Sequence, residues 1–375
     1  MSARALIVGA AEVPYARRSE RTTAELLADA AERACRDASI SLQDIDGIGV
    51  ASFTLQPDHA IDLAWRLGLH VRWLMDDANG GASALNLLQH ARRALEAGDA
   101  RRILLLAGDA LVGESFRALA DEYNSATRDH LAPLPFGGPN SLFALLTQRH
   151  MAAHGLGRED YGRIVVAQRA WAARNPDAVY RAPLTLQEYL DAPVVAEPLT
   201  RLDCVPIVSG ADALVVAAEG ERGIAIRALV AAHNPDDQAG DGLHTGLADV
   251  ADDLWRTAGL SPQDIDVVSV YDDYPAMALV QLADLGFARD GDPRALVEAI
   301  ADNELAVNTS GGQLSAGQAG AAGGMHGLVE VVRQLRGDAG ERQIANARLG
   351  LVSGYGMVLY RYGACANVAV LERAG

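Results

Sequence analysis

Cysteine is scarce in this sequence, and its scarcity limits the sites that the chain can build. The 375 residues include only three cysteines, Cys35, Cys204 and Cys365, at unrelated spacings. An odd, scattered set of thiols excludes a disulfide framework and is typical of a reducing compartment. Because the chain has no Cys-x-x-Cys pair, we predict no structural zinc within it.

Basic charge and long apolar runs are also lacking. Lys and Arg number 32 against 49 Asp and Glu, and the formal net charge of −17 is spread along the chain. Nucleic acid is therefore excluded as a partner, because binding to the phosphate backbone needs clustered basic residues. No apolar run approaches the length that crosses a bilayer, and the first residues show no signal-peptide cleavage pattern. These absences favour a cytoplasmic protein without membrane insertion.

What the sequence does contain is enough apolar material for a large core. Hydrophobic residues make up 50% of the chain and charged residues only 22%. Helical and strand-like patterns alternate, which predicts a layered α/β fold with largely buried sheets. The length exceeds that of one ordinary domain, so we expect two, residues 1–222 and 223–375. A stretch of the first domain, at about 113–198, has no counterpart in the second domain.

A repeated segment supports this division. "SLQDIDGIGV" begins at Ser41 and "SPQDIDVVSV" at Ser261, each after an amphipathic helical pattern (23–39 and 247–259) and before a β-branched run. Two Gly-Gly pairs then open helices that stop at a glycine. The matched elements are "GGASALNLLQHARRALEAG" at Gly80 with "GGMHGLVEVVRQLRG" at Gly323, and strand-like runs from Arg102 with Arg348 and from Gly210 with Tyr362. Matched elements in matched order indicate a duplicated fold.

Three stretches, taken with the duplication, carry a family resemblance. They are "ALIVGAAEVPYARRSERTTAELLADAAERACRDA", "YGRIVVAQRAWAARNPDAVYRAPLT" and the glycine-rich "NTSGGQLSAGQAGAAGG" of residues 308–324. They resemble the thiolase superfamily, in its lipid-transfer-protein or sterol-carrier-protein-X-type branch, and most of all the steroid side-chain-cleaving aldolases. The resemblance implies two duplicated five-stranded mixed-sheet halves in five layers, with the two Gly-Gly helices between the sheets. It also implies a loop domain inserted in the first half.

The same resemblance indicates which catalytic residues this chain has lost. A working thiolase carries a nucleophilic Cys at the start of the first Gly-Gly helix, a His after the Asn-x-x-Gly-Gly element and a second Cys before the final glycine-rich turn. Here Ala78, Gln318 and Ser353 stand at those places. Thiolysis and Claisen condensation through a cysteinyl acyl-enzyme are therefore excluded.

Tyrosines stand where other family residues would line the pocket. In "YDDYPAM", Tyr271 takes the place of a His, Asp272 matches a family Asp and Tyr274 replaces an aromatic residue. "SGYGM" puts Tyr355 in a glycine-rich turn that faces the same pocket in relatives. A phenol, with an ordinary pKa of about 10, is suited to donating a hydrogen bond to an oxyanion. We expect Tyr271, Tyr355 and Asp272 to be catalytic, with the general base either a phenol or Asp272.

A thioester pocket with an oxyanion donor and proton transfer, but without a thiol, favours retro-aldol cleavage of a β-hydroxyacyl-CoA. The resemblance points to a steroid side chain or a related lipid thioester as the substrate. Two alternatives stay open: a non-catalytic scaffold or lipid-carrier subunit, and other enolate chemistry such as hydrolysis or decarboxylation. The glycine spacing matches neither a P-loop nor a dinucleotide fingerprint, so no cofactor is expected beyond the CoA of the substrate.

The resemblance also implies binding residues and partners. Residues expected to bind the substrate are Asn308, Gly312, Gln318, His326, Tyr274 and Gly356, and those expected to contact the acyl group are His130, Phe136 and Tyr180. We expect a homodimer, paired through the strand-like run after the first Gly-Gly helix. We also expect an OB-fold partner with a zinc ribbon that helps to bind acyl-CoA and completes a heterotetramer. Any zinc would then belong to the partner.

Overall fold

A nine-stranded sheet organises the computed structural model of the protein. The described residues are 5–111, 113–131, 133–134, 138–218, 223–235, 242–288, 291–359 and 362–374. The strand order is β3-β2-β4-β7-β1-β8-β11-β10-β9, and β1 joins β8 in the middle through a short antiparallel pairing. A separate two-stranded sheet pairs β5 (Val194–Ala196) with β6 (Leu199–Thr200).

The two sides of this sheet repeat one topology. The first contains β1 (Leu6–Ala16), β2 (Gly47–Ala51), β3 (Trp73–Asp76), β4 (Arg102–Asp109) and β7 (Ser209–Ala217), and the second contains β8 (Ile224–His233), β9 (Val267–Ser269), β10 (Leu349–Leu359) and β11 (Tyr362–Arg373). In each, a parallel pair (β2 with β4, β9 with β10) continues into antiparallel partners (β7 and β1, β11 and β8). The pairings support the duplication, whereas the limits at 222 and 223 stay a prediction.

The second half departs from the expected five strands. Among its described residues there are four strands, and a parallel bridge between Val268 and Val307 stands where β3 pairs with β2 in the first half. One bridge is too short to count as a strand, and Asn308, directly after it, adopts a positive φ of 51° that turns the chain away.

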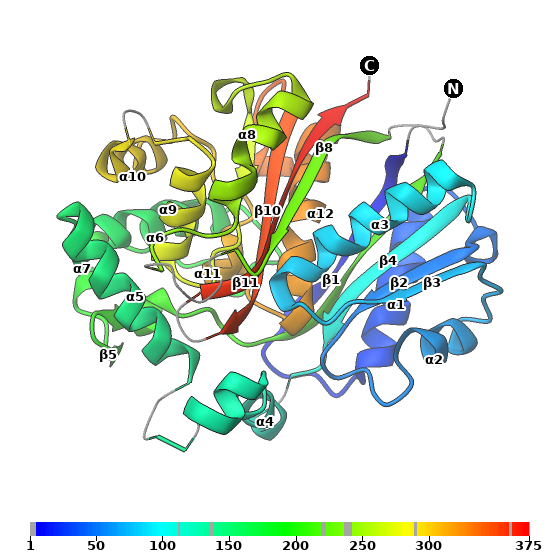
Figure 1. Ribbon diagram of the computed structural model, residues 1–375, viewed down its shortest axis with the longest axis horizontal. Helices are drawn as coiled ribbons and strands as arrows, with labels where there is room; N and C mark the ends of the chain where they lie inside the picture. The colour runs from blue at the N-terminus through cyan, green and yellow to red at the C-terminus, as the bar shows by residue number, and fades with distance from the viewer. Residues whose placement is uncertain are drawn as a thin grey trace.

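Helices form three layers around the two halves of the sheet (Figure 1). The outer layer of the first half is α1 (Thr23–Asp37) and α2 (His59–Arg66), and that of the second half is α8 (Leu247–Ala258), α9 (Pro275–Asp284) and α10 (Pro293–Ala301). Between the halves lie α3 (Ser83–Ala97) and α12 (Gly323–Arg336), which contact each other and strands of both. Helix α12 is buried almost all round, as expected of a central helix. The five-layer expectation is confirmed.

The N-terminal ends of α3 and α12 approach each other closely at glycine residues. A Cβ atom on Gly324 would lie 2.1 Å from the carbonyl oxygen of Gly81, a distance that no side chain tolerates. Gly81 belongs to a short 3₁₀ turn, η2 (Gly80–Ala82), that leads into α3. Both helices end at glycines in the left-handed conformation, Gly98 and Gly337. Small residues therefore permit this helix crossing.

The repeated "QDID" has a structural reason in both halves. It forms two short turns, η1 (Leu42–Asp44) and η5 (Pro262–Asp264), in each of which a capping serine bonds the aspartate three residues on. The last aspartate of each copy, Asp46 or Asp266, accepts two backbone N–H groups from the start of β4 or β10, at 2.8–2.9 Å. The motif thus joins each helix–strand unit to its neighbouring strand.

A long insertion follows β4 and has no counterpart after β10. It contains α4 (Gly113–Asp121), η3 (Thr127–Leu131), α5 (Pro139–His154), α6 (Arg158–Ala172) and α7 (Leu186–Leu190), and the chain returns to β7 through η4 (Arg201–Asp203). Helix α6 packs against α9, α10 and α11 (Gly312–Ala316) of the second half, on the left of Figure 1. Two further turns, η7 (Gly320–Ala322) and η8 (Gly340–Arg342), flank α12. Among the described helices, none has the length and apolar character to span a membrane.

Candidate active site

Asp272 follows β9 and lies fully buried at the start of α11. Its carboxylate accepts the backbone N–H groups of Gln313 at 2.9 Å and Leu314 at 3.4 Å. Gly312 makes this approach possible, because a Cβ atom there would stand 2.1 Å from the Asp272 Oδ2 atom. Burial raises the pKa of Asp272 to about 7, against the lowering effect of the two N–H groups and of His326. A carboxyl group that titrates near neutrality is suited to general-base catalysis.

Tyr271 stands beside Asp272 with its hydroxyl held by a side-chain amide. Gln318 Nε2 donates to the Tyr271 hydroxyl at 2.8 Å and to Gln313 Oε1 at 3.0 Å. The ring packs over Gly81, where a Cβ atom would lie 2.1 Å from Tyr271 Cε2. Burial, with Asp273 adding to it, raises the pKa of Tyr271 well above its ordinary value. The phenol is therefore a hydrogen-bond donor and proton source, not a base, near neutral pH.

Tyr355 lies on β10, buried on the sheet face that α9 covers. Its ring packs against Gly363 of β11, where a Cβ atom would lie 2.3 Å away. Burial first, and then the charge of Asp273, raises the pKa of Tyr355 well above the ordinary value. Asp273 acts in the same direction on Tyr271 and Tyr123. The charge of Asp273 therefore acts on both predicted tyrosines.

Asp273, the residue after Asp272, is a further member of this site to which the sequence analysis assigns no function. It is half-buried, and the Tyr274 backbone N–H donates to its carboxylate at 3.1 Å. Burial, with the adjacent Asp272, raises its pKa well above the ordinary value. Two consecutive acids directly after a buried strand were the signal available in the sequence.

A small cavity joins several predicted residues. It is lined by Ser269, Val270, Tyr271, Asp272, Gly312, Gln313, Gly323, Gly324, His326, Gly327 and Ser353. Its free volume of about 10 Å³ has room for about one water molecule. A larger cavity of about 310 Å³ lies away from this site, between α6 and α10. Tyr355, Gln318, Asn308, Tyr274 and Gly356 are not among the residues that line the small cavity.

Asn308, Ser353 and Gly356 fix the position of the backbone around the site. Asn308 Oδ1 accepts the Val270 N–H at 2.9 Å, while its buried Nδ2 atom has no partner among the described residues. Ser353, where the second family Cys would stand, donates to Gln281 Oε1 at 2.8 Å and so steadies the strand next to Tyr271. Gly356 leaves room for the carbonyl oxygen of Asn79, which would lie 2.1 Å from a Cβ atom at position 356.

Tyr274 and Tyr180, also predicted to contact the substrate, make contacts within the protein. The Tyr274 hydroxyl donates to Asn140 Oδ1 at 2.7 Å and its ring stacks on Phe143, so Tyr274 fastens the inserted α5 to α9. The Tyr180 ring is contacted by the guanidinium groups of Arg17 and Arg169, 4.6 and 5.0 Å from its centroid. Of the remaining two residues predicted to contact the acyl group, His130 is exposed and Phe136 lies outside the described residues.

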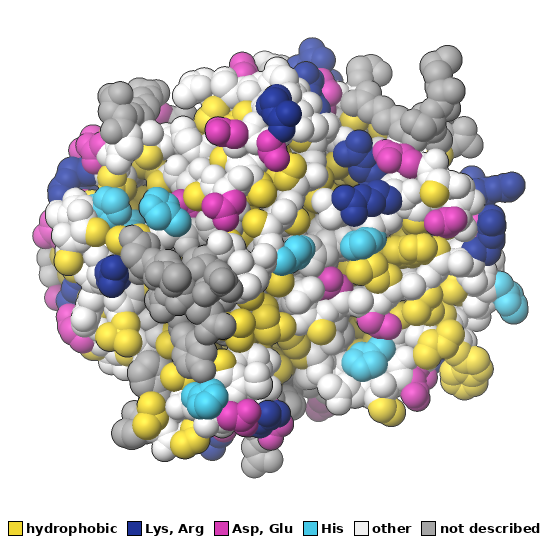
Figure 2. Space-filling view, viewed as in Figure 1, with side chains coloured by type: hydrophobic (Ala, Val, Ile, Leu, Met, Phe, Trp, Pro, Cys, Tyr) yellow, Lys and Arg dark blue, Asp and Glu magenta, His cyan; other side chains and the backbone are white. Residues whose placement is uncertain are grey.

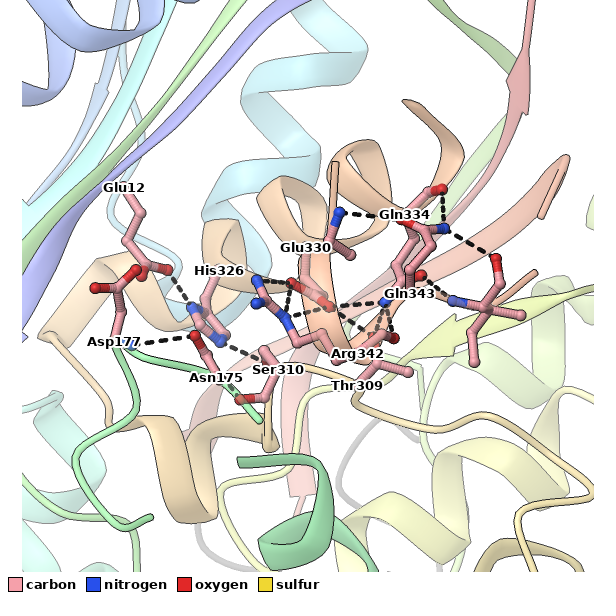
Figure 3. A network of polar contacts seen from close by, with 12 residues as sticks. Glu12, Asn175, Asp177, Thr309, Ser310, His326, Glu330, Gln334, Arg342 and Gln343 are labelled. Carbon is pink, nitrogen blue, oxygen red and sulfur yellow. Dashed lines mark hydrogen bonds and ion pairs between the residues drawn. The ribbon is translucent and has the colours of Figure 1, made fainter. Parts of the chain in front are cut away.

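His326 occupies a buried polar cluster behind the cavity (Figure 3). Within the described ranges, Glu12, Asp212 and His326 are the residues whose metal-binding atoms come together, all within 4.8 Å. Burial acts to lower the pKa of His326, but the charge and hydrogen bond of Glu12 raise it to about 9. An imidazolium ring has no lone pair for a metal, so we assign these residues to an ion pair.

The pair His150 and His154 on α5 also has a zinc-type spacing, which sequence reasoning overlooked. Their ring centroids lie 4.6 Å apart, and His150 Nδ1 is hydrogen-bonded to the Tyr161 hydroxyl at 2.8 Å. Burial lowers the pKa of His150 to about 4, so the ring is neutral and packs as part of the core.

Comparisons with known proteins identify the family of this chain. A family model described as thiolase C-terminal domain-like matches residues 229–373. The 17-hydroxy-3-oxo-4-pregnene-20-carboxyl-CoA lyase of Mycobacterium tuberculosis is 31% identical over 367 residues, covering 90% of this chain and 92% of that protein. The steroid side-chain-cleaving aldolase of Thermomonospora curvata is 29% identical, with 89% and 90% of the two chains covered.

Solved structures give the same assignment. The Ltp2-ChsH2(DUF35) aldolase is similar with a TM-score of 0.84 and 26% identity, over 99% of this chain and 98% of that one. An acetyl-CoA acetyltransferase from Syntrophomonas wolfei shares the fold, with a TM-score of 0.75, 16% identity and full coverage of both chains. The chain belongs to the thiolase superfamily, in the branch of the steroid side-chain-cleaving aldolases.

Proposed function

We propose that this chain is a thiolase-like carbon–carbon lyase that performs retro-aldol cleavage of a β-hydroxyacyl-CoA. The observation that carries the proposal is the pairing of one near-neutral carboxyl group, Asp272, with high-pKa phenols, in a site whose nucleophile position is Ala78. Relatives named as a pregnene carboxyl-CoA lyase and a steroid side-chain-cleaving aldolase support the same chemistry. A tertiary β-alcohol on a steroid side chain or related lipid is the proposed substrate, since it cannot be oxidised for thiolysis.

The proposed steps use a carboxylate as the base and phenols as hydrogen-bond donors and acids. Asp272 as carboxylate takes the β-hydroxyl proton, the oxygen lone pair forms the ketone C=O, and the Cα–Cβ electron pair moves into the thioester enolate. Tyr271 donates a hydrogen bond to the enolate oxygen, and a phenol, Tyr271 or Tyr355, returns a proton to Cα. The products are a ketone and a shortened acyl-CoA. No cofactor beyond CoA enters these steps.

A partner chain is part of the proposal. The cavity next to Asp272 has a free volume of about 10 Å³, far below that of an acyl chain, so substrate entry needs a rearrangement or a completed assembly. A related aldolase has been solved as Ltp2-ChsH2(DUF35). We propose an OB-fold protein with a zinc ribbon as the partner here, in a heterotetramer of two plus two chains.

The homodimer stays proposed, but the strand predicted to form it is wrong. β4, the run after the first Gly-Gly helix, is hydrogen-bonded on both sides, to β2 and β7, and has no free edge. β3 is one of the two edge strands of the sheet, and it contacts α2. Exposed hydrophobic side chains lie on both elements: Leu74 on β3, and Ile61 and Trp65 on α2, 60% and 77% exposed. Hydrophobic side chains are prominent over this side of the molecule, on the right of Figure 2. We place the two-fold contact at β3.

The scaffold and hydrolase alternatives make different predictions for one experiment. The purified chain, with any co-encoded partner, is incubated with a tertiary β-hydroxyacyl-CoA, and the products are identified by mass. The lyase gives ketone and shortened acyl-CoA. A hydrolase gives free CoA and the intact acid, and a scaffold returns the substrate unchanged.

A further inference from the structure

A chain of hydrogen-bonded, buried polar groups leads from Glu12 on β1 towards Asp272. Glu12, on β1, accepts a hydrogen bond from His326 Nδ1 of α12 at 2.8 Å. His326 Nε2 lies 2.8 Å from the Ser310 hydroxyl oxygen. Figure 3 shows these side chains pointing at one another in this order. Glu12 and His326 are 314 residues apart in the chain, so only the fold brings them together.

This line of groups continues through the backbone into the proposed active site. The Gly312 N–H donates to the Ser310 hydroxyl oxygen at 3.2 Å. The next two N–H groups, of Gln313 and Leu314, donate to Asp272. Ser310 therefore ties His326 to the turn of α11 that holds the carboxylate. His326 and Asp272 also line the same small cavity.

The charges along this line are those of an ion pair. Burial alone would raise the pKa of Glu12, but His326 lowers it to about 2, and Glu12 in turn raises that of His326 to about 9. At neutral pH both groups are charged, and the imidazolium donates at both nitrogens. Ser310 thus accepts from His326 and from Gly312. The arrangement is unlike a nucleophilic serine triad, because a protonated imidazole cannot take the serine proton.

We propose that Glu12 and His326 are positioning residues for the lyase: their buried ion pair, acting through Ser310, fixes the turn that holds Asp272 and favours the carboxylate form of Asp272. This inference rests on the proposed function for its catalytic meaning. Its physical part, the control of the charge on Asp272, can be measured without substrate.

Other charged groups face both ends of this line. His326 is faced by Glu12, by Asp212 of β7 and by Glu330 of its own helix, and Asp272 is faced by His326, Asp273 and Tyr271. Glu12 is also faced by Asp212, Tyr15, Arg333 and Arg342. Glu330 is held by Arg342 at 2.9 Å, so its own charge is largely balanced. Among these anions Glu12 contributes most to the charge of His326, through its own charge and its hydrogen bond, so Glu12→Gln favours the neutral imidazole.

The test is a titration of Asp272 in Glu12→Gln. The protein carries ¹³C-labelled aspartate carboxyl groups, and the Asp272 resonance is assigned by its loss in Asp272→Asn. We expect its pKa to rise by about one unit in Glu12→Gln, because an opposite charge has been removed from its surroundings. His326→Gln removes the same cation from the other side and gives a second reading if Glu12→Gln does not fold. The acid limb of kcat/KM should move up by the same amount.

Asp203→Asn is the matched control. Asp203 is as deeply buried and accepts bonds from Tyr189 and Thr200, but it has no contact with the Glu12–His326–Ser310 line. It should lower stability without moving the Asp272 titration. An unmoved Asp272 pKa in both Glu12→Gln and His326→Gln would overturn the inference. Failure of the wild-type protein to cleave any β-hydroxyacyl-CoA would instead overturn the proposed function, and the titration would still decide the electrostatic link.

Discussion

Replacing Tyr271 by Phe separates its chemical role from its packing role. The substitution removes one hydroxyl, which accepts a single side-chain hydrogen bond from Gln318. The Gln318 amide keeps its bond to Gln313 Oε1 at 3.0 Å, so one N–H is left without a partner. The expected cost in folding free energy is about 1–2 kcal/mol, seen as a fall of a few degrees in Tm.

The expected loss of turnover is larger than this cost in stability. General acid catalysis contributes ~10²–10⁴-fold, which corresponds to about 3–5 kcal/mol of activation free energy. We therefore expect kcat to fall by that factor in Tyr271→Phe, and similarly in Tyr355→Phe, with the fold intact. The assay is release of shortened acyl-CoA, measured beside thermal unfolding.

A control variant distinguishes the two effects. Tyr161→Phe removes another buried phenol hydroxyl. Tyr161 lies on the inserted α6, and its hydroxyl is hydrogen-bonded to His150 of α5 at 2.8 Å. The substitution should cost similar stability and leave kcat within a few-fold of wild type. Wild-type turnover in both folded and assembled variants, Tyr271→Phe and Tyr355→Phe, would refute the two-tyrosine mechanism and favour the scaffold alternative.

Three further predictions concern a glycine beside Asp272, the Glu12–His326 ion pair and the exposed Trp65. Gly312→Ala should abolish turnover and reduce stability, because its Cβ atom would lie 2.1 Å from Asp272 Oδ2 at a φ of 61°; unchanged kcat would contradict this geometry. Folding stability, measured by denaturant unfolding, should be greatest near pH 4.5–6.5. It should fall in acid as Glu12 protonates towards its pKa of about 2, and in base as His326 deprotonates through its pKa of about 9. Both pH dependences should be weaker in Glu12→Gln. Trp65→Glu should weaken self-association in sedimentation without lowering Tm, and an unchanged dimer would place the contact elsewhere.

Regular elements could be predicted because their signals are local. The helix expected over 247–259 is α8, Leu247–Ala258, and it ends at Gly259 in the left-handed conformation that only glycine adopts easily. The strand expected from Arg102 is β4. Amphipathic period and glycine caps decide such elements within one stretch of chain.

Features that depend on distant pairing could not be predicted. The fifth strand of the second half is reduced to a bridge at Val307, which no local pattern records. The position of β4 inside the sheet, which excludes it as a dimer edge, depends on its two partners. The hydrogen bonds of His326 to Glu12 and Ser310 also depend on distant parts of the chain, whereas its role in substrate binding stays a prediction. Its partner lies in an apolar strand near the start of the chain.

The central claim is that a site without a nucleophile breaks a carbon–carbon bond, and a single incubation tests it. The protein, purified with any co-encoded partner, is mixed with a tertiary β-hydroxyacyl-CoA labelled with ¹³C in the part beyond Cβ, and the products are identified by mass. The account predicts a labelled ketone and an unlabelled, shortened acyl-CoA in equal amounts. Recovery of intact substrate, or of free CoA with the whole labelled acid, would contradict it.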